Sequence, residues 1–240
     1  MDAPLRHIAA KTAQPPVIEL RDVRLTLSSR AGPVEILRGV DLAVAPGQSV
    51  GIVGPSGSGK TTLLMAIAGL ERVTSGSLAV AGRALGELSE DALAAFRRDH
   101  VGIVFQAFHL IATMTALENV AVPLEFKGHP DAASRARAVL ERVGLGHRLA
   151  HYPGELSGGE QQRVAIARAV ATGAQLILAD EPTGNLDQET GSQIIDLLFS
   201  LVEEGVTLLL VTHDHSLAQA CDRLVAIRDG LIEPARGEPA

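Results

Sequence analysis

A glycine-rich loop that ends in a lysine and a threonine is the strongest chemical signal in the sequence. Residues 54–61 read GPSGSGKT and match the pattern G-x-x-x-x-G-K-[ST], between an apolar run at 49–53 and a helical pattern from Thr62. Glycines let the backbone approach anionic oxygens, loop N–H groups and the helix N-terminus bind them, and Lys60 adds a positive charge. We therefore expect a site for the phosphates of a nucleoside triphosphate, with the hydroxyl of Thr61 on Mg²⁺.

The expected phosphate contacts all belong to this loop and to the first turn of the helix behind it. They are Gly54, Pro55, Ser56, Gly57, Ser58, Gly59, Lys60, Thr61 and Thr62. A dinucleotide site of the Rossmann type is disfavoured, because Thr62 stands where the third glycine of that fingerprint belongs. The alternative is a flexible Gly/Ser turn with a chance lysine, and the strand and helix patterns that flank the loop argue against it.

Two adjacent carboxylates follow another apolar run. Residues 176–179 lead directly into Asp180 and Glu181. In a doubly wound α/β fold, ligands bind at the carboxyl ends of the strands, so both acids are expected to face the phosphates. Asp180 suits Mg²⁺, bound through a water, and Glu181 suits a base that orients and deprotonates an attacking water. A kinase needs no such water-directed base, so the pair favours hydrolysis.

A second candidate phosphate site lies at the start of another predicted helix. Ser157 and Glu160 have the S-x-x-E spacing of a capping box, which by itself predicts only where a helix begins. Capping does not explain Gly158 and Gly159, because a glycine inside a helix costs about 1 kcal/mol relative to alanine. Bare N–H groups in a first helical turn favour a phosphate. Two phosphate-binding elements in one chain are reasonable if they serve different nucleotides across a dimer.

The elements that must position these residues alternate between strands and helices. Between about 106 and 159 no convincing strand appears, and we interpret this segment as an inserted helical subdomain. The chain from 17 to 232 is expected to form one α/β domain, with tails at 1–16 and 233–240. The expected strands are mostly apolar throughout, as in a parallel sheet buried on both faces, and comprise 49–53, 101–105, 176–179, 206–211 and 224–227.

Composition narrows the classes of function. The chain has 240 residues, enough for one substantial domain, and a net charge of −7, which argues against a surface that grips nucleic acid or anionic lipid. No apolar stretch approaches the roughly 20 residues of a membrane-spanning helix, and no apolar signal-peptide core stands near the N-terminus, so we expect a cytoplasmic protein. The single Cys221 excludes an internal disulfide and is expected to be buried.

Taken together, these segments resemble the nucleotide-binding subunits of ATP-binding cassette (ABC) transporters, over nearly all of 17–232. LSGGEQ at 156–161 is the signature motif of that family, and LILADE at 176–181 matches its acidic strand end. TALENVAVPL at 115–124 and LADEPTGNLD at 178–187 resemble the branch with the lipoprotein-releasing, macrolide-export and cell-division ATPases, closest to a poorly characterised group of exporter subunits. The resemblance implies a P-loop NTPase core with a mainly parallel sheet, the helical subdomain and a small antiparallel N-terminal β region.

The resemblance also assigns roles to single residues. Gln106 falls at the Q-loop, which touches Mg²⁺ and the attacking water and links the site to the membrane partner. Asp187 lies in the D-loop, which joins the two active sites of a dimer, and His213 matches the switch histidine that contacts the γ-phosphate and orients the catalytic acid. The implied Mg²⁺ ligands are Thr61, Gln106 and Asp180, and the partner subunit's nucleotide is contacted by Ser157, Gly158 and Gly159.

Leu27 marks a departure from the family. An ungapped count places it where an aromatic side chain usually stacks on adenine, and only 2% of the residues in this chain are aromatic. How adenine is held is therefore open.

The implied function is that of an ATPase whose homodimer forms on ATP binding and moves a membrane-spanning permease, for export or for extraction of lipids or lipoproteins. It would work at the cytoplasmic face of the cell membrane, with ATP and Mg²⁺ as cofactors and without nucleic acid. Phe108, Leu110 and Met114 are candidate permease contacts, although ordinary packing inside the subdomain explains them as well.

The alternative function is that of an ABC ATPase that signals mechanically to envelope enzymes. A soluble ABC protein of DNA repair or translation is disfavoured, because no long coiled-coil insertion is present.

Overall fold

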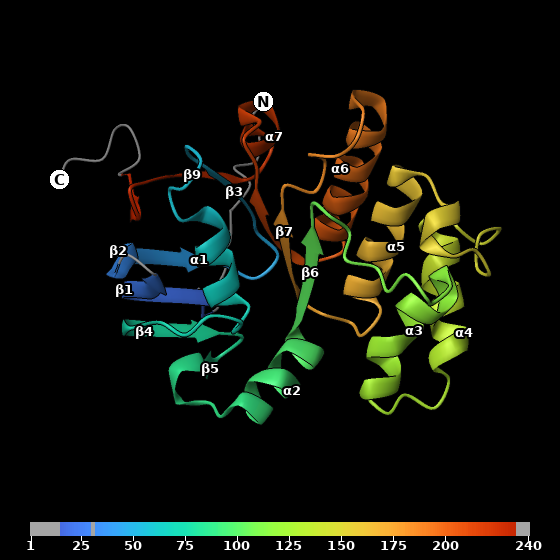
Figure 1. The fold of residues 1–240 in the computed structure, drawn as a ribbon, viewed down its shortest axis with the longest axis horizontal. Coiled ribbons are helices and arrows are strands. Elements are labelled where there is room, and N and C mark those ends of the chain that lie inside the picture. Colours follow the sequence, from blue (N-terminus) through green and yellow to red (C-terminus); the bar gives the residue numbers. More distant parts are fainter. Residues whose placement is uncertain (1–14, 30–31, 234–240) are drawn as a thin grey trace, which may run out of the picture.

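A computed structural model describes residues 15–29 and 32–233 of the chain, which form two β-sheets covered by helices. Figure 1 shows the antiparallel sheet at one end of the molecule and helices α3 and α4 at the other, with strands β6 and β7 between them. The expected tails, 1–16 and 233–240, lie outside the described residues except for Pro15, Pro16 and Glu233.

The central sheet has the order β10-β9-β3-β8-β7-β6 and is parallel except for the β9–β10 pair. All residues of β3 and β8 are buried, which explains why these strands read as unbroken apolar runs. Because β3, β8 and β7 are neighbours, their carboxyl ends meet at one edge. The strands are β3 (Ser49–Val53), β6 (Val101–Phe105), β7 (Leu176–Asp180), β8 (Thr207–Val211), β9 (Arg223–Arg228) and β10 (Leu231–Ile232).

The second sheet is antiparallel, with the order β2-β1-β4-β5. It confirms the antiparallel N-terminal region implied by the resemblance, although β1 and β2 span 12 and 13 residues. Buried residues of this sheet, of α1 and of the central sheet form one continuous core. The elements are β1 (Ile18–Ser29), β2 (Gly32–Val44), β4 (Ser75–Val80), β5 (Arg83–Ala84), α1 (Lys60–Ile67) and α2 (Glu90–His100).

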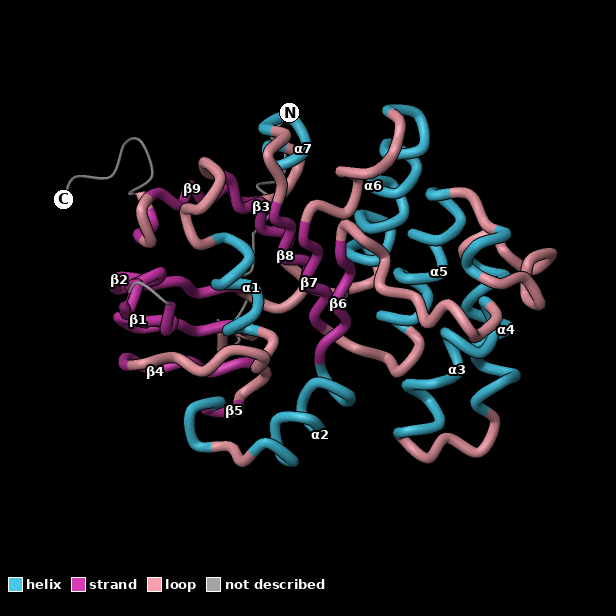
Figure 2. Tube along the Cα trace, viewed as in Figure 1, coloured by secondary structure: helices cyan, strands magenta, loops and turns pink. Residues whose placement is uncertain are grey.

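Residues 106–159 carry helices and loops and no strand. Figure 2 shows α3 and α4 beside α5, away from the strands of the antiparallel sheet. The three helices enclose a core of their own around Val120, Leu140 and Val164. The remaining helices are α3 (Ala116–Phe126), α4 (Ala132–Arg142), α5 (Gly158–Val170), α6 (Gln188–Glu203) and α7 (His215–Gln219), with single 3₁₀ turns at Leu85–Glu87 and Pro153–Glu155.

Two expectations from the composition can be compared with the described residues. Cys221 is buried and free, and burial raises the pKa of its thiol to about 11, so it is not a reactive thiolate. No helix in the described part of the chain is long and apolar enough to span a membrane.

Candidate functional site

The phosphate loop turns sharply between β3 and α1, and its glycines make that turn possible. Gly54, Gly57 and Gly59 have φ values of +156°, +78° and +102°, a region that side-chain-bearing residues rarely adopt. A side chain at Gly54 would overlap the carbonyl oxygen of Ile227, and one at Gly59 would lie 3.2 Å from the carbonyl oxygen of Ile36. The loop therefore packs against neighbouring backbone while its N–H groups remain near the helix start.

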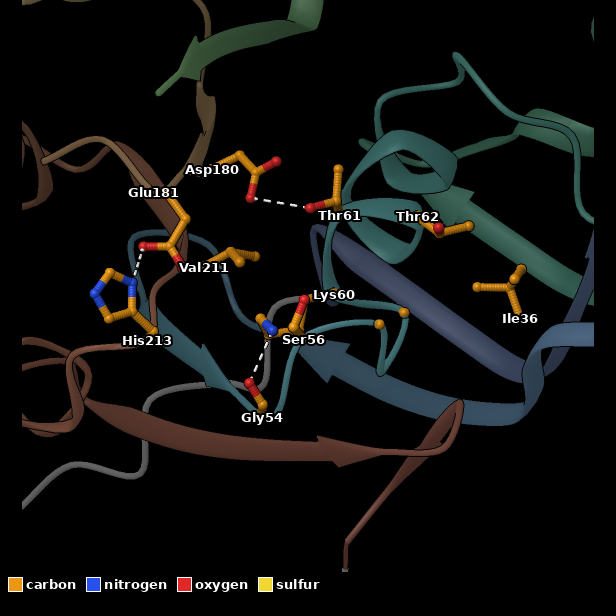
Figure 3. Close-up of a pocket in the computed structure, with 12 residues that line it drawn as sticks. Ile36, Gly54, Ser56, Lys60, Thr61, Thr62, Asp180, Glu181, Val211 and His213 are labelled. Carbon is orange, nitrogen blue, oxygen red and sulfur yellow. Dashed lines mark hydrogen bonds and ion pairs between the residues drawn. The ribbon is translucent and has the colours of Figure 1, made fainter. Parts of the chain in front are cut away.

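Lys60 is the first residue of α1, and its side chain folds back over the loop. Its Nζ donates a hydrogen bond to the carbonyl oxygen of Gly54 at 2.8 Å (Figure 3). It also donates to the carbonyl oxygen of Pro55 at 2.9 Å. Among the described residues, Lys60 has no carboxylate within salt-bridge distance. Its positive charge is therefore free to meet an anion that enters over the loop.

A cavity of about 510 Å³ opens beside the loop. It brings together the loop, the ends of β7 and β8, and Ile36 of β2 (Figure 3). Pro55 and Ser58 are not part of its wall, and the buried hydroxyl of Ser58 has no hydrogen-bond partner among the described residues. The cavity is lined by Ile36, Gly54, Ser56, Gly57, Gly59, Lys60, Thr61, Thr62, Asp180, Glu181, Val211 and His213.

Asp180 and Thr61 place two oxygen ligands side by side in the cavity wall. Thr61 Oγ1 donates to Asp180 Oδ1 at 3.3 Å. Burial raises the pKa of Asp180, and the hydrogen bond from Thr61 opposes that shift. A partly desolvated carboxylate beside a hydroxyl suits Mg²⁺, which typically takes one or two carboxylates together with substrate phosphates and waters. The described residues include no cluster of three or more His, Cys, Asp or Glu that would form a dedicated metal cage.

Glu181 and His213 form a pair at the rim of the cavity. His213 Nδ1 lies 2.8 Å from Glu181 Oε2 (Figure 3). The side chain of His213 is 76% exposed and that of Glu181 is 20% exposed. The backbone of Glu181 is left-handed, with φ of +48°, and its N–H donates to the carbonyl oxygen of Val211. Such a conformation costs about 1–3 kcal/mol in a residue other than glycine, and the surrounding structure must hold it. The carboxylate is thus fixed beside the phosphate loop.

Gln106 is not brought into the cavity. Its Nε2 donates to Asn185 Oδ1 at 3.1 Å, and Asn185 Nδ2 donates to the carbonyl oxygen of Gln106 at 3.0 Å. A side chain at Gly184 would lie 2.7 Å from Gln106 Nε2, so the glycine makes room for this arrangement. The structure therefore places Gln106 against the loop that follows β7.

The start of α5 forms the capping box that the sequence predicts. The Ser157 hydroxyl accepts from the Glu160 N–H at 3.3 Å, and the Glu160 carboxylate accepts from the Ser157 N–H at 2.8 Å. Packing also explains why glycine stands at positions 158 and 159. A side chain at Gly159 would overlap Thr190 of α6, and one at Gly158 would lie 3.2 Å from Leu186. The α5 start contributes no residue to the cavity beside the phosphate loop.

Asp187 caps α6. Its carboxylate accepts from the N–H of Thr190 at 2.9 Å and from the Thr190 hydroxyl at 2.7 Å, and these bonds lower the pKa of Asp187. Asp187 and His213 line a second cavity, of about 490 Å³, between the loop after β7 and α7. Asp187 and His213 thus lie on one continuous stretch of surface.

Ile36 is a site residue that sequence reasoning missed. Leu27 pairs with Val34 in the β1–β2 hairpin and does not line the cavity, whereas Ile36 does. The ungapped count considered only β1, so it did not include the partner strand. The pairing of two long β-type segments was the signal that could have pointed to β2.

The three candidate partner contacts differ in their surroundings. Leu110 packs against the core of the α3–α5 region, as expected for an ordinary interior residue. Phe108 lies near Gly158, and it has a left-handed backbone with φ of +61°. Phe108, Leu110 and Met114 are all only partly exposed.

Comparisons with known proteins agree with this geometry. Residues 37–184 match the family described as ABC transporter. The chain is 49% identical to the lipoprotein-releasing system ATP-binding protein LolD 2 of Caulobacter vibrioides, over 92% of this chain and 98% of the relative. It is 45% identical to the macrolide export ATP-binding/permease protein MacB 1 of Aeromonas hydrophila, over 93% of this chain, and it spans 35% of that relative.

A solved structure shows the same fold. The dimeric, post-hydrolysis ATP-binding cassette MJ0796, bound to ADP and Pi, superimposes with a TM-score of 0.83 at 41% identity, covering 90% of this chain and 97% of that one. The resemblance and the α/β fold class are confirmed. The chain belongs to the ABC transporter family, as an ATP-binding and ATP-hydrolysing subunit of the branch that includes the lipoprotein-releasing and macrolide-export proteins.

Proposed function

We propose that two copies of this chain enclose two ATP molecules and that hydrolysis at the shared interface drives a membrane-spanning permease. In each site, residues 54–62 of one copy hold the phosphates, and Ser157, Gly158 and Gly159 of the other copy meet the γ-phosphate. Two observations support the arrangement. The α5 start lies outside the cavity of its own chain, and the related cassette MJ0796 was solved as a dimer.

Thr61 and Asp180 are proposed to hold Mg²⁺, with Gln106 as a third ligand once it leaves Asn185. The support is the pairing of the Thr61 hydroxyl with a carboxylate whose burial favours a nearby cation. When bound, Mg²⁺ would neutralise charge on the phosphate oxygens. Lys60, which lines the same cavity, would add a second positive charge.

Glu181 is the proposed general base. It lies at the end of β7 beside the phosphate loop, and the contact with His213 fixes the direction of its carboxylate. Glu181 orients a water toward the γ-phosphate and accepts its proton, while His213 contacts the phosphate and keeps the carboxylate in place. Asp187 is proposed to join the two sites of the dimer. The 2.8 Å contact between Glu181 and His213 is the observation that carries the proposed function.

The permease is proposed to dock on the helical subdomain, about 106–159, within a single domain of 17–232. Phe108, Leu110 and Met114 are candidate contacts, and the packing of Leu110 against the core of the helical region makes it the weakest of the three. The protein would then work at the cytoplasmic face of the cell membrane, attached through its partner. The relatives are named for lipoprotein release and macrolide export, which supports export or lipid extraction over mechanical signalling.

The test is Glu181→Gln in the full chain. The variant is expected to bind ATP with unchanged affinity, to lose at least about 100-fold in turnover, and to accumulate as an ATP-bound dimer in size-exclusion chromatography. Glu203→Gln, the same change on an exposed residue at the end of α6, serves as the control and should behave as wild type. Normal turnover in Glu181→Gln would overturn the assigned base.

A further inference from the structure

An ion pair lies at the start of α5, and neither of its residues belongs to the proposed catalytic or phosphate-binding set. Arg148 Nε donates to Glu160 Oε1 at 2.8 Å, and Arg148 Nη1 lies 3.1 Å from His151 Nε2. The side chain of Glu160 is 13% exposed and that of Arg148 is 35% exposed, so the pair is partly shielded from water. Ion pairs in this position interact more strongly than pairs on an open surface.

Glu160 carries its charge in the same helical turn as Gly158 and Gly159. One carboxylate oxygen accepts from the N–H of Ser157 and the other from Arg148. The bonds from the Ser157 backbone and hydroxyl, together with Arg148, hold the pKa of Glu160 below its usual range, and the group is therefore ionised at neutral pH. An ionised carboxylate stabilises its own helix start, but it repels a phosphate that approaches the same turn.

Arg148 is held in place before any ligand arrives. The backbone N–H of Arg148 donates to the carbonyl oxygen of Leu145 at 2.9 Å. The backbone carbonyl oxygen of Arg148 accepts from the backbone N–H of His151 at 3.0 Å. The carbonyl oxygen of His151 in turn accepts from the N–H of Ala116, at the start of α3. The backbone of the loop that carries Arg148 is thus tied to the helical region, and the guanidinium is directed at Glu160 and His151.

We propose that Arg148 is a positioning residue of the α5 phosphate site, which neutralises Glu160 so that this helix start accepts the γ-phosphate of the ATP held by a second copy. The inference rests on the proposed function and adds a residue to it. Arg148 acts through Glu160 and is not expected to touch ATP. The Glu160 carboxylate caps the helix and Arg148 removes the electrostatic penalty of that cap for an incoming anion.

The two halves of the ion pair should therefore have opposite effects on ATP. Arg148→Gln leaves an uncompensated carboxylate in the turn, and the ATP concentration for half-maximal dimer formation should rise about fivefold. Glu160→Gln keeps a capping side chain and leaves Arg148 positive, so this concentration should stay the same or fall. The double variant should return to within about twofold of the starting protein, because both charges are gone.

The experiment uses the full chain with Glu181→Gln, in which ATP-bound dimers accumulate, and follows dimer formation by analytical ultracentrifugation across an ATP titration. Arg72→Gln is the matched control. It breaks the 2.7 Å ion pair of Arg72 with Glu90 on α2 and changes the net charge equally, and it should leave the titration unchanged. Raising the salt concentration should shrink the effect of Arg148→Gln only in part, because Glu160 is 13% exposed and partly buried charges are screened less than open ones.

The direction of the two ATP titrations separates this role from simple stabilisation, with thermal unfolding as the measure of stability. Both single variants lose the same ion pair, so a structural role alone would lower the melting temperature in each and shift both ATP titrations in the same direction. Equal shifts for Arg148→Gln and Glu160→Gln, or no shift for Arg148→Gln, would overturn the inference. Absence of an ATP-driven dimer in Glu181→Gln itself would overturn the proposed function and this inference with it.

Discussion

The cavity beside the phosphate loop and the start of α5 use the same parts in different ways. Each combines glycines with a helix N-terminus, yet the glycines of the loop leave an open cavity of about 510 Å³, whereas Gly158 and Gly159 fit against Leu186 and Thr190. The first region brings together residues from the carboxyl ends of three strands of one chain, β3, β7 and β8. The second contributes nothing to that cavity. In the proposed dimer, the loop of one copy and the α5 start of another together make a complete site.

The largest expected effect comes from removing the charge at the loop. Lys60→Ala should weaken ATP binding by about 10- to 100-fold, the range expected for losing a hydrogen bond to a charged phosphate, as measured by equilibrium dialysis. Lys127→Ala is the control, because Lys127 also donates to a backbone carbonyl, that of Thr172, far along the chain from the loop. Equal affinity in both variants would mean that the loop is not the primary phosphate site.

A moderate effect is expected where the loop after β7 holds Gln106. Asn185→Ala removes both hydrogen bonds that keep Gln106 out of the cavity, so turnover should rise by up to about fivefold while ATP affinity stays constant. In a Gln106→Ala background the same change should do nothing, since the side chain it releases is absent. Steady-state ATPase assays check this, and an unchanged or slower Asn185→Ala enzyme would contradict it.

The smallest effect, on the stability of the fold, is expected at the start of β3, the end opposite to the phosphate loop. The backbone N–H and the hydroxyl of Ser49 donate to Asp222 and hold the pKa of that carboxyl below its usual range. A lowered pKa means that Asp222 stabilises the fold above the ordinary value of 3.8 and that this contribution fades as the pH falls through the folded-state pKa. Asp222→Asn should cost no more than about 1 kcal/mol near neutral pH, because solvent screens the group.

Thermal unfolding at several pH values measures this difference. The gap in melting temperature between wild type and Asp222→Asn should close in acid, while ATP affinity stays unchanged at neutral pH. A gap that widens in acid would contradict the sign of the contribution.

Local patterns in the sequence predicted five strands of the central sheet, the phosphate loop and the acids at the end of β7, because each is determined by residues close together in the chain. Local patterns could not predict contacts between segments that are far apart in the chain. The position of Gln106 depends on Asn185, 79 residues further along. Ile36 enters the cavity through the pairing of β1 with β2, and Gly159 is small partly because Thr190 of α6 lies against it. These three details need the assembled sheet and helices.

Mixing two inactive variants tests most directly whether each site is shared between copies. Lys60→Ala disables the phosphate loop, and Gly158→Asp places a carboxylate among the N–H groups of the α5 start, so each variant alone should lose ATPase activity. An equal mixture should regain about a quarter of the wild-type rate, because half of the randomly formed dimers are mixed and each mixed dimer has one intact site of two. A mixture as inactive as its components would contradict a site built from two copies.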